Sequence, residues 1–73
     1  LSTDPLAAAE AGLTASAEDV RQRGLQTLLA ETRKKPPQRE GDAGWGLFVR
    51  ALNDPAAGVR REAFKAALNQ GVA

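Results

Sequence analysis

The side chains that most often carry out enzyme chemistry are scarce in this chain. It has no histidine and no cysteine, which removes the commonest general base, the commonest transition-metal ligand and any thiolate or disulfide. Ser2 and Ser16 therefore have no histidine partner, and we predict that they cap helices. An acid–base dyad would need two convergent carboxylates in a pocket. We expect no catalytic residue, metal site or cofactor, because most carboxylates are scattered singly or beside cations: Glu10, Glu18, Asp19, Glu31, Glu40, Asp42 and Glu62.

Cationic side chains are the remaining candidates for chemistry. Arg33, Lys34, Lys35 and Arg39 form a basic cluster. We predict that this cluster is a solvated helix end that leads into a loop, and the alternative is contact with phosphates or with an acidic partner. The formal net charge of +1 gives the chain as a whole no electrostatic footprint for nucleic acid or for an anionic membrane.

Two further arginines occupy positions where a charge is costly. At about 100° per residue, Arg60 falls within the apolar arc of its helix, between Val59 and Phe64, and Arg21 occupies the same place beside Val20. A guanidinium in such an arc must be paired and hydrogen-bonded. Its planar fork can bridge carboxylates or backbone carbonyls of neighbouring turns. We therefore predict a structural role for both arginines, with direct ligand binding as the alternative.

Helix-start and helix-stop signals divide the chain into four predicted helices. Thr3 or Asp4 can cap a helix that begins at Pro5, and Ser16 starts a capping-box pattern. Asn53-Asp54-Pro55 repeats the cap-then-proline start, and Gly71 suits a helix end. The predicted helices span about residues 5–13, 17–32 and 45–53, and from Pro55 to about Gln70, and no strand pattern is present.

The apolar side chains predict a thin core. Alanine accounts for 15 residues, so few large apolar side chains remain. Burying one of these contributes about 1.5–3 kcal/mol, which the entropy of ordering the chain can offset. Trp45 follows a glycine-rich segment, so partial exposure as a binding anchor is the alternative to burial for that side chain. The predicted apolar faces consist of Leu6, Ala9, Leu13, Val20, Leu25, Leu28, Leu29, Trp45, Phe48, Val49 and Leu52, and in the last helix of Ala56, Val59, Ala63, Phe64, Ala67 and Leu68.

The two halves of the chain superpose without a gap at an offset of 39 residues, as from Val20 to Val59. The same offset relates Leu13 to Leu52, Arg21 to Arg60, Leu25 to Phe64 and Leu29 to Leu68. A period of about 40 residues built from two helices is typical of helical solenoid repeats. We therefore expect an all-α fold of two stacked helical hairpins in a single small domain, 1–73. Repeat unit 1 is expected at about 5–32, a linker at 33–44 and repeat unit 2 at about 45–70.

The second half resembles the HEAT-repeat family. It carries the family pattern of Leu, Asp-Pro, Val-Arg and Ala-Leu as Leu52, Asp54-Pro55, Val59-Arg60 and Ala67-Leu68. It is most similar to the bacterial HEAT-like repeats of phycobilisome-lyase-type proteins. That resemblance implies an α-solenoid fragment with a hydrogen-bonded ladder of Asp and Arg between successive repeats, involving Asp54, Arg21 and Arg60. The first half has Ala15 in place of the Asp, as a divergent end cap would.

The resemblance favours a non-catalytic protein–protein interaction or scaffold module. The partner is expected to be a protein, or the remainder of a larger chain, that contacts the second helices through Gln22, Gln26, Arg61 and Lys65. The first alternative is nucleic-acid binding through a basic surface, as in HEAT-like alkylpurine DNA glycosylases. The residues for that alternative are Arg23, Arg33, Lys34, Lys35 and Arg61. The second alternative is a structural cap or spacer of a larger enzyme, which the start at Leu1 rather than Met favours by indicating an excised or processed segment.

The sequence shows no sign of a membrane segment. No apolar run approaches the ~20 residues of a membrane-spanning helix, and no signal-peptide core is present. We therefore expect a cytoplasmic protein without a membrane partner.

Overall fold

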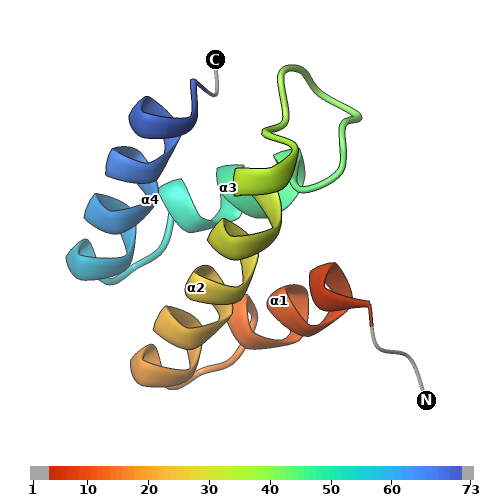
Figure 1. Cartoon of the computed structure of the whole chain (residues 1–73). Helices are drawn as coiled ribbons and strands as arrows, with labels where there is room; N and C mark the ends of the chain where they lie inside the picture. Colours follow the sequence, from red (N-terminus) through yellow and green to blue (C-terminus); the bar gives the residue numbers. More distant parts are fainter. Residues whose placement is uncertain (1–3, 72–73) are drawn as a thin grey trace.

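The computed structural model describes residues 4–71, and within them the chain forms four α-helices and no strand. The helices are α1 (Pro5–Leu13), α2 (Glu18–Lys34), α3 (Trp45–Leu52) and α4 (Ala57–Gln70). α1 packs against α2 and α3 packs against α4, which makes two helical hairpins. The second hairpin lies beside the first mainly through α2 and α4, with α4 at one margin of the molecule (Figure 1). The predicted all-α fold of two stacked hairpins is confirmed.

The predicted first residue of α1 and the predicted end of α4 are confirmed. The Asp4 carboxylate accepts the Leu6 amide at 3.0 Å, and Pro5 is the first residue of α1, as predicted. The proposed caps Ser2 and Thr3 lie outside the described residues. Gly71 ends α4 with φ 72°, a left-handed conformation that favours glycine, as predicted.

The predicted starts of the second helices are wrong by up to two residues. α2 begins at Glu18 after Ala17, and Ser16 gives no side-chain cap. α4 begins at Ala57 rather than at the proline. The reason is the same in both places. The residues before each helix form a separate turn, and two carbonyls of that turn accept hydrogen bonds from an arginine that lies five and six residues further along the chain.

The segment between α2 and α3 is an ordered loop. The Asp42 carboxylate accepts the amides of Gln38 at 2.9 Å and Arg39 at 3.3 Å, and Pro37 is buried. Gly41 and Gly44 adopt φ values of 99° and 88°, which few other residues tolerate. α2 extends two residues further into the predicted linker than expected, to Lys34.

The core is only partly the predicted one. Leu13, Leu25, Leu28, Leu29 and Phe48 are buried as predicted, and so are Val59 and Ala63 on the apolar side of α4. Leu6 and Leu52 are half-buried against the core, and Trp45 is also half-buried. The predictions of burial are wrong for four side chains, which are exposed: Val20, Val49, Phe64 and Leu68.

The first hairpin has an unusually close helix crossing. A Cβ on Gly12 would lie 2.7 Å from the Gly24 Cα, and a Cβ on Gly24 would lie 2.7 Å from the Leu13 amide nitrogen. Backbone atoms cannot move aside as a side-chain end can, so α1 and α2 need glycine at both positions. The equivalent positions in the second hairpin, at the offset of 39, hold the small residues Ala51 and Ala63.

We predict that Gly24→Ala destabilises the domain by about 1–3 kcal/mol, because the new methyl group overpacks the α1–α2 crossing. Helix propensity alone would give a stabilisation of about 1 kcal/mol. Gly46→Ala is the matched control, since Gly46 is a helical residue with nothing within 4 Å of an added Cβ. It should stabilise the domain. Urea unfolding followed by circular dichroism measures both, and a stabilising Gly24→Ala would contradict the close crossing.

Candidate functional site

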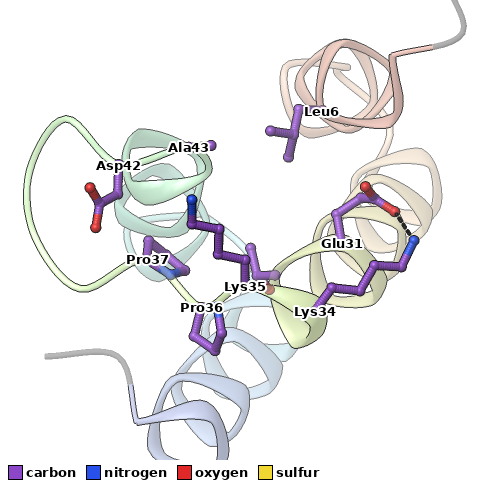
Figure 2. Close-up of a pocket in the computed structure, with 9 residues that line it drawn as sticks. Leu6, Glu31, Lys34, Lys35, Pro36, Pro37, Asp42 and Ala43 are labelled. Atoms are coloured by element: carbon purple, nitrogen blue, oxygen red, sulfur yellow. Dashed lines mark hydrogen bonds and ion pairs between the residues drawn. The ribbon is translucent and has the colours of Figure 1, made fainter.

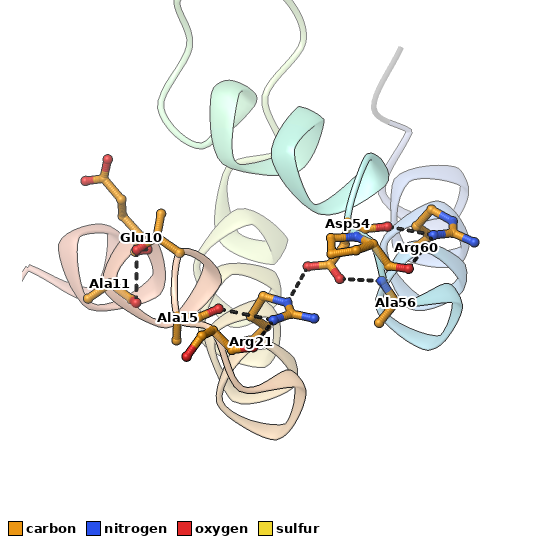
Figure 3. A network of polar contacts seen from close by, with 10 residues as sticks. Glu10, Ala11, Ala15, Arg21, Asp54, Ala56 and Arg60 are labelled. Carbon is orange, nitrogen blue, oxygen red and sulfur yellow. Dashed lines mark hydrogen bonds and ion pairs between the residues drawn. The ribbon is translucent and has the colours of Figure 1, made fainter.

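A buried ion pair joins the two hairpins. The Arg21 Nε of α2 donates to the Asp54 Oδ2 at 2.9 Å (Figure 3). The two side chains are 12% and 2% exposed, so both charges have left water. The second carboxylate oxygen accepts the Ala56 amide at 2.8 Å, which shapes the turn before α4. The pair thus fixes the start of the second hairpin relative to the second helix of the first.

Arg21 also holds the turn of its own hairpin. Its Nη1 donates to the Ala15 carbonyl at 3.1 Å and to the Ser16 carbonyl at 2.6 Å. These hydrogen bonds and the ion pair together give partners to the Nε and Nη1 of a guanidinium that the sequence placed within an apolar arc. Leucine and valine side chains could not replace it, because the turn carbonyls would lose their donor.

Arg60 repeats this geometry in the second hairpin. Its Nη1 donates to the Asp54 carbonyl at 2.7 Å and to the Pro55 carbonyl at 3.0 Å, from the same spacing along the chain as in Arg21 (Figure 3). Among the described residues, however, no carboxylate lies within 4 Å of the Arg60 guanidinium. Arg60 is exposed, so the sequence-based placement in a buried arc is wrong for this residue.

Two large apolar side chains lie on the same side of α4 as Arg60, at spacings of four and eight residues. Phe64 is 58% exposed and Leu68 is 67% exposed, whereas their equivalents in the first hairpin, Leu25 and Leu29, are 0% and 7% exposed. Leu52 on α3 is half-buried, and its equivalent Leu13 is buried. The difference arises because the second hairpin covers the first. We call the uncovered surface formed by Leu52, Arg60, Phe64 and Leu68 the open face.

The predicted partner-binding residues on the second helices of the two hairpins do not all line the same groove. Gln26, Arg33 and Lys65 line a groove between α2 and α4, together with Glu62 and Asn69. The buried Gln70 Oε1 beside this groove has no hydrogen-bond partner among residues 4–71.

The other two predicted contact residues do not line this groove. Arg61 is exposed on α4. Gln22 is half-buried between the helices, where its Nε2 would lie 3.2 Å from a Cβ on Gly58.

The basic cluster does not form one surface. Arg33 faces the α2–α4 groove, whereas Lys34 and Lys35 line a separate cavity of about 250 Å³ on the linker side (Figure 2). Lys34 donates to the Glu31 carboxylate at 3.1 Å, which neutralises part of that cavity. Arg39 lies on the loop near Asp42, with its side chain in solvent. Arg23, the remaining residue of the nucleic-acid hypothesis, is exposed near Asp19.

The described residues hold no group of three or more Asp or Glu side chains that could bind a metal ion. In the same part of the chain, no helix is both long enough and apolar enough to cross a membrane.

No protein-family model, curated protein or solved structure compared with this chain matches it.

We predict that Arg21→Ala destabilises the domain by about 3–5 kcal/mol, because it leaves the Asp54 carboxylate buried and unpaired. Arg60→Ala is the matched control: it removes the same two hydrogen bonds to turn carbonyls but no ion pair, and it should cost about 1 kcal/mol. Urea unfolding followed by the fluorescence of Trp45, the single tryptophan, measures both. Equal losses for the two variants would show that the ion pair contributes nothing beyond the carbonyl contacts.

Proposed function

We propose that this domain is a non-catalytic protein-interaction or scaffold module built of HEAT-like hairpins, and that its partner stacks on the open face. The observation that carries the proposal is the exposure of Phe64 and Leu68 at positions whose equivalents are buried by a neighbouring hairpin. Exposed aromatic and aliphatic side chains gathered on one face are typical of interaction sites. Contacts in stacked helical repeats run mainly between neighbours, so the end of such a stack is a natural docking surface.

The geometry also explains how a domain with so thin a core would gain from a partner. Phe64 and Leu68 are among the few large apolar residues of the chain, yet they contribute little to its own core. Covering both would bury apolar surface at about 25 cal/mol per Å². A stacked partner would therefore stabilise α4 as well as bind to it.

A photocrosslinking experiment tests the proposal. Benzoylphenylalanine replaces Leu68 on the open face, or Lys65 in the α2–α4 groove as the matched position three residues away. In cells that express the chain, we expect a discrete protein adduct from position 68 that the additional substitution Phe64→Lys removes. Adducts from position 65 alone would move the partner to the groove. The absence of adducts from both positions would contradict an interaction module.

The nucleic-acid alternative makes a different prediction. Phosphate binding needs several cations on one surface, and the structure divides the basic cluster between a groove and a cavity. We expect no tight binding of labelled duplex DNA in fluorescence anisotropy, even at low salt. Tight binding that collapses as salt rises would support the alternative, and the substitutions Arg33→Ala and Lys34→Ala would then identify the surface involved.

A further inference from the structure

The two hairpins leave different faces uncovered at the two ends of the molecule. At one end Phe64 and Leu68 are exposed, whereas their equivalents in the first hairpin are buried. At the other end Val20 is 36% exposed, whereas its equivalent in the second hairpin, Val59, is buried. The second hairpin thus has a free face of the kind that receives a hairpin, and the first has a free face of the kind that docks on one.

The charges beside these two faces are opposite in sign. The first turn of α2, next to Val20, carries Glu18 and Asp19, and both side chains are exposed. Asp19 lies 3.8 Å from Arg23, but both of these side chains are largely in solvent, so the pair holds the carboxylate only weakly. The exposed charged residues of α4 are all basic: Arg60, Arg61 and Lys65.

The contact between the two hairpins shows which of these charges would meet. A Cβ on Gly58 would lie 3.2 Å from the Gln22 Nε2, so residues 22 and 58 are neighbours across that contact. At the offset of 39, the equivalent of Gln22 is Arg61, and the equivalent of Gly58 is Asp19. An uncharged amide facing a glycine inside the chain therefore corresponds to a cation at one end of the molecule and an acid at the other.

We infer that a second copy of this chain occupies the open face, with its first hairpin stacked on α4 and its Asp19 carboxylate paired with Arg61. The inference rests on the proposed function and names the partner. The contact joins unlike faces, and each copy has one of each, so association continues beyond a dimer. Opposite charges also select this orientation, because two open faces brought together would set the cations of α4 against each other.

The contact between copies is weaker than the contact between hairpins inside the chain. Ala15 stands at the position equivalent to Asp54, so the buried ion pair with Arg21 has no counterpart at the open face. The pair of Asp19 and Arg61 joins residues that are exposed in the single chain, and such pairs contribute less and are screened by salt. We therefore expect monomers in dilute solution and assembly as the concentration rises.

Sedimentation equilibrium at concentrations up to about 1 mM, the range of weak protein contacts, tests the inference. The average mass of the parent chain should rise past that of a dimer. Arg61→Glu should weaken association about tenfold or more, because it sets two acids against each other. Arg50→Glu is the matched control and should leave association unchanged, since it alters net charge equally at an exposed residue that lines the grooves between α1 and α3. Adding Asp19→Lys to Arg61→Glu should restore association by reversing the pair.

Circular dichroism confirms that each variant is folded, and the outcomes then separate the two proposals. A parent chain that stays monomeric throughout, or equal losses for Arg61→Glu and Arg50→Glu, would overturn the inference. An adduct from position 68 to a different protein would still support the proposed function. Association that Phe64→Lys removes but Arg61→Glu leaves intact would keep the open face and overturn the pairing with Asp19. Association that persists in Phe64→Lys would count against the open face itself, and so against the proposed function.

Discussion

The structure depends on one buried ion pair, between Arg21 and Asp54. Burying either charge alone would be unfavourable, and the cost is offset because each side chain has several hydrogen-bonding partners. Arg21 satisfies the carbonyls of the first turn, and Asp54 satisfies the Ala56 amide of the second. The pair therefore couples two local turns and one interface between hairpins.

The repeat explains the asymmetry of the two ends. Leu25 and Leu29 are buried because a hairpin lies over them, and Phe64 and Leu68 are exposed because the described chain has none in that place. Val20 and Val59 show the reverse, since Val59 packs against the first hairpin while Val20 faces outward. Exposure of these side chains is thus set by the position of their hairpin in the stack, and the large apolar residues on α4 remain available to a partner.

The remaining surface carries charges of both signs. The α2–α4 groove combines Arg33 and Lys65 with Glu62 and uncharged amides, and the linker cavity combines Lys34 and Lys35 with Glu31 and Asp42. Mixed charges of this kind lower the potential that a polyanion would experience. The open face, by contrast, combines three large apolar side chains with one cation, Arg60, which two turn carbonyls hold.

The four helices, their pairing and the period of 39 could be predicted from the sequence, because capping residues, glycines and apolar spacing act within a few residues. The resemblance to HEAT repeats, rather than any local pattern, grouped Arg21, Asp54 and Arg60 as one set. The tertiary structure alone decided which carboxylate meets which arginine, and that Phe64 and Leu68 lie outside the core. A helical wheel shows which arc is apolar, but whether that arc is buried depends on what the neighbouring hairpin covers. Burial is a property of contacts between distant segments, and no local pattern specifies it.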